Sequence, residues 1–195
     1  TGKSKAYNLL ISEDVKASIS AIKKLGIKVK ILKNYCEIDG KGMDGYQYKN
    51  DMTIDAKNSG TLGRLLLGLL VNSDKKIKII GDKSLSKRDF KRIADPLSRF
   101  GAKLKLKKNK NLPLIIKGTE KLKPFTYIEK RGSAQCKSAV MLAALNTKGE
   151  TIIKAKKSRN HSELIFKHLN LNIKTRTKNL LDIIKIRGQQ KIKPF

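Results

Sequence analysis

The chain has 195 residues, 39% of them hydrophobic, so it is long and apolar enough to bury a core, which excludes a disordered polyelectrolyte. Its longest apolar stretch, residues 65–71, falls well short of the ~20 residues that a membrane-spanning helix needs. The 45 Lys and Arg residues, against 16 Asp and Glu, give a formal net charge of +29, which raises nucleic acid as a candidate partner.

The hydrophobic pattern predicts three successive groups of strands and helices. Residues 1–40 predict a strand, a helix and two strands, at 5–10, 13–25, 27–32 and 35–39. Residues 51–118 predict a βαβαββ unit, with strands at 52–55, 76–81, 103–107 and 113–117 and helices at 60–72 and 87–100. Residues 124–188 predict a second such unit, with strands at 125–129, 151–155, 172–176 and 181–187 and helices at 134–146 and 161–169.

The three groups form an internal repeat. Similar four-residue segments close the last predicted helix of each group. They are Leu25-Gly26-Ile27-Lys28, Phe100-Gly101-Ala102-Lys103 and, more loosely, Leu169-Asn170-Leu171-Asn172. The first group has only a βαββ order, so we expect its opening strand and buried helix to lie before Thr1. The sequence therefore predicts a domain whose first repeat is partial.

The helices and strands are predicted to be layered in the reverse of the usual α/β order. Helices 60–72 and 134–146 are apolar almost all round past their first turn, which is typical of helices that are buried on every side. Segments 28–31, 103–107 and 173–176 alternate cations with apolar or Thr residues, as do strands with one buried and one solvated face. We therefore expect helices inside, amphipathic sheets outside, and most cations on solvated outer faces.

The two cysteines, Cys36 and Cys136, are far apart in the sequence and have no partner spacing for zinc or for a disulfide framework. We interpret them as reduced, buried thiols, which is typical of a protein in the cytoplasm.

The starts of the predicted helices share a chemistry that capping alone does not explain. Each joins small or hydroxyl residues to a cation, in segments 58–64, 84–89, 131–137 and 157–161. Small and hydroxyl residues are ordinary caps, but a cation in the first turn opposes the helix dipole by up to about 1 kcal/mol. Free N–H groups at a helix start bind anions, and Arg grips phosphate or carboxylate with two N–H groups. These features predict a site for small phosphorylated or carboxylated molecules, with Gly60 allowing close approach.

Four segments resemble motifs of the 5-enolpyruvylshikimate-3-phosphate (EPSP) synthase family. Asn58-Ser59-Gly60-Thr61, followed by Arg64, resembles the N-[AS]-G-T-x-x-R motif, and residues 81–88 (GDKSLSKR) resemble the G-D-x-S-L-x-x-R-P motif. Residues 132–139 (GSAQCKSA) resemble the S-A-Q-x-K-S-A motif, and residues 158–163 (SRNHSE) resemble the S-R-D-H-T-E motif. The motifs follow in the family's order and spacing, and the resemblance covers nearly the whole chain.

The resemblance implies an α/β fold of the inside-out barrel type (enolpyruvyl transferase-like), built from repeated βαβαββ units in two domains that close on the substrates. It implies transfer of the enolpyruvyl group of phosphoenolpyruvate to shikimate 3-phosphate in aromatic amino-acid biosynthesis, with no cofactor and no metal. It also implies that glyphosate occupies the phosphoenolpyruvate position. By resemblance, shikimate 3-phosphate binds Ser133, Ala134, Gln135, Ser158 and Arg159. Phosphoenolpyruvate binds Asn58, Gly60, Thr61, Arg64, Arg88 and Gln135.

Several features depart from the family pattern. The family's K-S-x-x-x-x-R motif would fall before Thr1, and Asp89 stands where the family usually has Pro, which places beside Arg88 a carboxylate that can weaken its charge. His161 and His168 are interpreted as capping and surface residues, so no catalytic acid or base is predicted here. We expect residues 1–195 to be the N-terminal domain of a monomeric cytoplasmic enzyme, inactive without the second domain that supplies proton transfer.

Three other interpretations stay open. A UDP-amino-sugar enolpyruvyl transferase shares the fold but differs in the loops that correspond to N-S-G-T and S-A-Q here. A basic nucleic-acid-binding module would cluster its cations among exposed aromatic residues, whereas aromatics are 5% of this chain and its cations are dispersed. A structural domain with vestigial ligand loops is the third.

Overall fold

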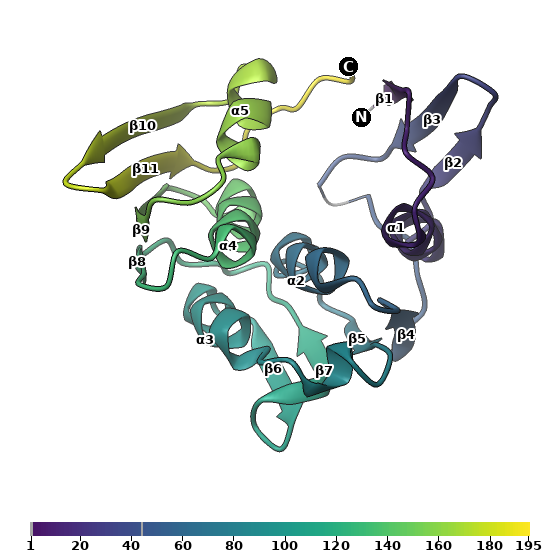
Figure 1. The fold of residues 1–195 in the computed structure, drawn as a ribbon, viewed down its shortest axis with the longest axis horizontal. Coiled ribbons are helices and arrows are strands. Elements are labelled where there is room, and N and C mark those ends of the chain that lie inside the picture. Colours follow the sequence, from purple (N-terminus) through teal and green to yellow (C-terminus); the bar gives the residue numbers. More distant parts are fainter. Residues whose placement is uncertain (1, 44) are drawn as a thin grey trace.

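The computed structural model describes residues 2–43 and 45–195 and contains three sheets, one for each predicted group (Figure 1). The first group consists of β1 (Gly2–Tyr7), α1 (Glu13–Lys24), β2 (Lys28–Ile31) and β3 (Tyr35–Gly40), with strand order β1-β3-β2. The strand predicted at 5–10 lies three residues earlier, because Asn8 takes a left-handed conformation with φ 53° just after β1.

The other two groups share one topology. The second consists of β4 (Met52–Asp55), α2 (Gly60–Leu69), β5 (Lys76–Ile80), α3 (Lys91–Phe100), β6 (Lys103–Lys107) and β7 (Asn111–Lys117). The third consists of β8 (Thr126–Glu129), α4 (Ala134–Asn146), β9 (Glu150–Lys156), α5 (His161–His168), β10 (Ile173–Lys178) and β11 (Leu181–Arg187). The strand orders are β4-β5-β7-β6 and β8-β9-β11-β10, and in each sheet only the first pair is parallel. The order β1-β3-β2 repeats the last three strands of this plan.

The second helix of the middle group begins later than the sequence predicts. Instead of a helix from residue 87, the chain forms a short 3-10 turn, η1 (Leu85–Lys87), and α3 starts at Lys91. Arg88 between them is extended, with φ −75° and ψ 152°. Asp89 Oδ1 accepts a hydrogen bond from the Lys91 N–H at 2.9 Å, so this carboxylate closes the start of α3. Within the described residues it forms no ion pair with Arg88.

Helices α2 and α4 lie in the hydrophobic core, as their all-round apolar pattern predicts. Leu67 on α2 and Ala139, Val140 and Met141 on α4 are completely buried. The two helices meet at Gly68, where an added β-carbon would lie 2.2 Å from the carbonyl oxygen of Ala139, so glycine alone permits this close approach. In Figure 1 the helices occupy the middle of the molecule and the sheets its periphery. The predicted inside-out α/β arrangement is confirmed.

Most strands have one buried and one solvated face. On β5, Ile77 and Ile79 are completely buried, while Lys76 and Lys78 are exposed. The same pattern predicted for residues 173–176 is wrong, because β10 is exposed along its whole length apart from a half-buried Ile173. β10 is an edge strand that pairs with β11, and its far end projects to the side of the molecule (Figure 1), so only Ile173 packs against the core and the residues after it are exposed on both faces.

The positive charge is spread over the outer faces of the sheets. Lys103, Lys105 and Lys107 on β6 are all exposed, which fits a solvated coat better than a concentrated basic stripe. None of the helices in residues 2–43 and 45–195 has the length and apolar character needed to cross a membrane. Cys36 and Cys136 are buried and unbridged, as predicted.

Candidate functional site

The loop before α2 is tied to the turn before α3. Ser59 caps α2, its Oγ accepting the N–H of Leu62 at 3.2 Å. The preceding Asn58 donates through Nδ2 to Asp82 Oδ2 at 2.5 Å, and Asp82 Oδ1 accepts the N–H of Leu85 at 2.7 Å. These two hydrogen bonds lower the pKa of Asp82. Asn58 therefore fixes the loop that precedes α2, while its amide is already engaged within the chain.

Two guanidinium groups converge on Gly60, the first residue of α2. A β-carbon on Gly60 would lie 2.9 Å from Nη1 of Arg64 and 3.2 Å from Nη1 of Arg88. The Arg64 guanidinium also lies 5.0 Å from the ring centre of Phe90, in a cation–π contact. Burial lowers the pKa of Arg64, and the positive charges of Arg88 and Arg92 lower it further. Like charges held this close favour the binding of an anion between them.

Gln135 connects this arginine pair to the start of α4. Arg64 Nη1 donates to Gln135 Oε1 at 2.7 Å, and Gln135 Nε2 donates to Thr61 Oγ1 at 2.9 Å. These residues are more than 70 positions apart in the sequence. The structure therefore brings Thr61, Arg64 and Gln135 together, and the contacts among them cross from one repeat to the next.

The start of α4 is fixed by a buried carboxylate that the sequence analysis did not single out. Ser133 caps α4, its Oγ accepting the N–H of Cys136 at 3.3 Å, and Ala134 is the first helical residue. The backbone N–H of Ser133 donates to Glu129 Oε2 at 2.9 Å, and Arg92 Nη2 lies 3.5 Å from Glu129 Oε1. Glu129 is only 4% exposed. In the sequence, the feature that could have pointed to this role of Glu129 is an acidic residue at the end of a predicted strand in a strongly basic chain.

The loop before α5 lies beside the loop before α4. A β-carbon on Gly132 would lie 3.6 Å from the carbonyl oxygen of Lys157. The hydroxyl of Ser158 is buried and has no hydrogen-bond partner among residues 2–43 and 45–195, while Arg159 is exposed. A buried hydroxyl without a partner is costly, so this position is suited to a ligand. His161 and His168 are exposed at the two ends of α5, which confirms His168 as a surface residue. The capping role expected of His161 is wrong, because Asn160 occupies the N-cap position and His161 is the first helical residue.

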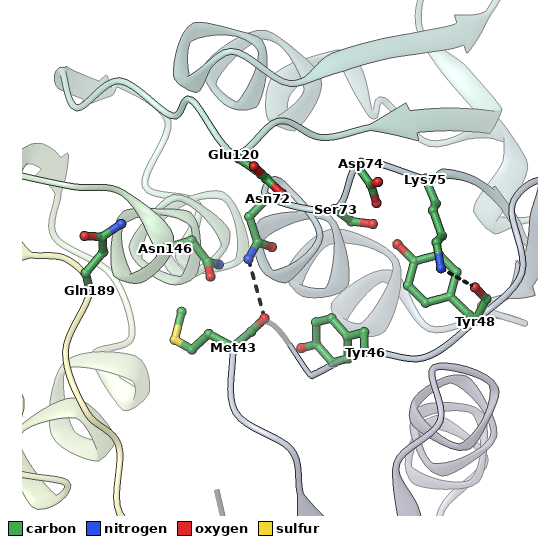
Figure 2. A pocket seen from close by; sticks show the side chains of 10 residues that line it. All are labelled: Met43, Tyr46, Tyr48, Asn72, Ser73, Asp74, Lys75, Glu120, Asn146 and Gln189. Atoms are coloured by element: carbon green, nitrogen blue, oxygen red, sulfur yellow. Dashed lines mark hydrogen bonds between the residues drawn. The ribbon is translucent and has the colours of Figure 1, made fainter.

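A separate pocket of about 380 Å³ lies at the opposite ends of α2 and α4 (Figure 2). Asn72 lies just beyond the end of α2 and Asn146 ends α4, and none of the predicted site residues lines the pocket. The C-terminal ends of helices carry partial negative charge. Asp74 and Glu120 add carboxylates to the lining, and burial followed by the charge of Asp74 raises the pKa of Tyr48 to about 12. Apart from Lys75, the charged groups of this lining are carboxylates, so the pocket is less suited to an anion than the arginine pair at the helix N-termini.

Comparison with known proteins identifies the family of the chain. The family model of EPSP synthase (3-phosphoshikimate 1-carboxyvinyltransferase) matches residues 1–195. A Clostridium tetani protein named 3-phosphoshikimate 1-carboxyvinyltransferase is 37% identical over 92% of this chain and 40% of its own length. A Streptococcus agalactiae protein of the same name is 42% identical over 83% of this chain and 38% of its own length.

The likeness extends to three dimensions. The solved structure of EPSP synthase from Acinetobacter baumannii superposes with a TM-score of 0.89 at 31% identity, covering 99% of this chain and 43% of that one. The chain thus spans about two fifths of the length of the proteins that it matches. Because the family model matches the chain from end to end, this protein belongs to the EPSP synthase (3-phosphoshikimate 1-carboxyvinyltransferase) family.

Proposed function

We propose that this chain forms part of an enzyme that transfers the enolpyruvyl group of phosphoenolpyruvate to shikimate 3-phosphate with release of phosphate. The observation that carries the proposal is the bridge from Arg64 through Gln135 to Thr61, next to the approach of Arg88 to Gly60. The bridge brings two cations and an amide together, which supports a site for two anionic substrates. The names of the relatives supply the reaction.

The phosphoenolpyruvate position is assigned to the start of α2 and the turn before α3. Arg64 and Arg88 would hold the phosphate and carboxylate with paired N–H groups, and the missing side chain of Gly60 leaves room for the ligand. Thr61 and Asn58 are uncharged and would shape the position. The same guanidinium groups would stabilise the charge that develops on the departing phosphate.

The shikimate 3-phosphate position is assigned to the starts of α4 and α5. Ser133, Ala134 and Ser158 would receive the 3-phosphate through hydroxyl and backbone N–H groups, with Arg159 supplying charge. Gln135 lies between the two positions and would contact both substrates. Holding the acceptor hydroxyl against the enolpyruvyl carbon converts a bimolecular reaction into a positioned one, which is a large part of catalysis in such transfers.

Proton transfer is assigned to residues outside these 195. Among the described residues, the carboxylates in the loops around the arginine pair include Glu129, Asp82 and Asp89, and each accepts hydrogen bonds from backbone or side-chain donors. The relatives are more than twice as long as this chain, and we propose a second domain as the source of the acid and base.

The proposal is tested by phosphate release from the full-length gene product that contains these residues. With phosphoenolpyruvate and shikimate 3-phosphate together, we expect steady release, and loss of that release in Arg88→Ala. A parallel reaction with a UDP-amino sugar as acceptor should give none. A folded wild-type protein that releases phosphate with the UDP-amino sugar, or with neither acceptor, would refute the proposal.

A further inference from the structure

A buried ion pair joins α4 to α5 behind the proposed shikimate 3-phosphate position. Nζ of Lys137 on α4 lies 2.6 Å from Oε1 of Glu163 on α5. The Lys137 side chain is 0% exposed and that of Glu163 is 7% exposed. Among the described residues, Lys137 is the one buried member of the 45 Lys and Arg side chains. It is thus an exception to the solvated coat formed by the other cations.

The same two helices are joined again at the neighbouring positions. Ser162 Oγ donates to Ser138 Oγ at 2.7 Å, so residues 137 and 138 of α4 contact residues 163 and 162 of α5. A second carboxylate, that of Asp182 on β11, lies 3.8 Å from Lys137 Nζ and accepts the hydroxyl of Thr177 through its other oxygen. The ammonium group is therefore held between an element of the helix layer and the sheet.

The pair lies within about one helical turn, along α4 and α5, of the residues assigned to the substrate. Lys137 comes two positions after Gln135, and its backbone N–H donates to the carbonyl oxygen of Ser133 at 3.0 Å. Glu163 is in the first turn of α5, four positions after Arg159. Any shift of α5 along α4 would break the ion pair and would also move Ser158 and Arg159 relative to Ser133.

A stabilising role alone does not account for a charged pair at this place. Removing two charges from water costs free energy that their attraction recovers only in part, and a well-packed apolar pair is often as stable. An ion pair differs from apolar contacts because its two charged groups come within contact distance in only one relative placement of the two helices. Apolar side chains of similar size tolerate sliding. The start of α5 is tied to α4 by this ion pair and by the hydrogen bond of Ser162 to Ser138, whereas the hydroxyl of Ser158 and the second oxygen of Glu163 are buried without a hydrogen-bond partner among the described residues.

We propose that Lys137 and Glu163 are positioning residues for the shikimate 3-phosphate half of the site. The pair sets the loop of Ser158 and Arg159 at a fixed distance from the start of α4, with no contact of its own to the substrate. The inference rests on the proposed function, because it assigns these two loops to shikimate 3-phosphate.

The first test is Glu163→Gln in the full-length gene product, which keeps the shape of the side chain and removes its charge. We expect the KM for shikimate 3-phosphate to rise by about tenfold to a hundredfold, as small misplacements of binding groups do. The KM for phosphoenolpyruvate, bound at α2, should stay within about twofold of wild type, since distant sites act independently. Lys185→Met is the matched control, because it breaks the exposed pair of Lys185 and Glu150 in the same repeat. It should change neither KM.

The second test is the double variant Lys137→Met/Glu163→Leu, which also decides the matter if a single variant fails to fold. We expect its melting temperature to lie close to that of wild type, because the two buried charges are removed together and Asp182, which loses the more distant ammonium group, is partly exposed and keeps the hydroxyl of Thr177. The KM for shikimate 3-phosphate should nevertheless remain raised. If the double variant has both the wild-type melting temperature and the wild-type KM for shikimate 3-phosphate, the pair is merely structural and the inference is overturned. An equal rise of the KM for both substrates would overturn it too. Absence of phosphate release by wild-type protein would instead refute the proposed function, and the inference with it.

Discussion

Replacing Gly60 by alanine should separate ligand binding from folding in this domain. The added β-carbon would lie 2.9 Å from Arg64 Nη1 and 3.2 Å from Arg88 Nη1. Both atoms are ends of flexible side chains, so the guanidinium groups can move away at little cost to the fold. Alanine also has the higher helix propensity, by up to about 1 kcal/mol. We therefore expect Gly60→Ala to melt at or above the wild-type temperature while it displaces the cations from the proposed phosphoenolpyruvate position.

The magnitude follows from the contacts that would be lost. A hydrogen bond to a charged group contributes about 1.5–3 kcal/mol, which corresponds to roughly 10- to 150-fold in affinity. Displacing one guanidinium should raise the KM for phosphoenolpyruvate by that factor and leave the KM for shikimate 3-phosphate nearly unchanged. Glyphosate, if it occupies the same position, should lose potency in parallel. Steady-state phosphate release with each substrate varied in turn measures all three quantities.

Gly68→Ala is the control, on the same helix and with the same chemical change. Its β-carbon would lie 2.2 Å from the backbone carbonyl oxygen of Ala139, which cannot move without separating α2 from α4. Overpacking of this kind costs about 1–3 kcal/mol, or roughly 2 to 12 °C in melting temperature for a domain of this size. A Gly60→Ala protein that melts as low as Gly68→Ala, or that keeps the wild-type KM for phosphoenolpyruvate, would refute the reasoning.

Three further outcomes are expected. The pKa of Asp82 lies below its ordinary value of 3.8, so the hydrogen bonds of its carboxylate to Asn58 and Leu85 stabilise the fold above that pH. This stabilisation is lost as the pH falls through the lowered pKa. In urea unfolding, the free energies of unfolding of wild type and Asp82→Asn should therefore converge in acid. The 195-residue chain alone should unfold cooperatively in urea but release no phosphate, and release by the chain alone would mean that its acid and base have been overlooked. Binding to duplex DNA should be weak and lost by ~200 mM salt, whereas submicromolar, sequence-selective binding in a filter assay would favour the nucleic-acid interpretation.

The sequence by itself predicted the layering, which the structure confirms, and the chemistry of the candidate site. The all-round apolar faces of residues 60–72 and 134–146 leave no polar side to meet water, so burial of these helices follows from composition alone. The alternation of lysines with Ile and Leu in β5 and β6 fixes which strand face is wet. The helix starts combine caps with cations, and that combination was enough to predict an anion site before any fold was known.

Only the tertiary structure decided how these pieces meet. Period-two and period-3.6 patterns report which face of an element is buried, but they do not say which element covers it. The contact of Gln135 with Arg64 and Thr61 depends on the packing of α2 against α4. The exposure of β10 depends on the edge position of the strand, which its own residues do not encode. In the sequence Lys137 is one of the cations at the helix starts, and only the fold shows that it is buried 2.6 Å from Glu163. A charge can be buried only where the fold supplies its partner, and that partner comes from a distant part of the chain.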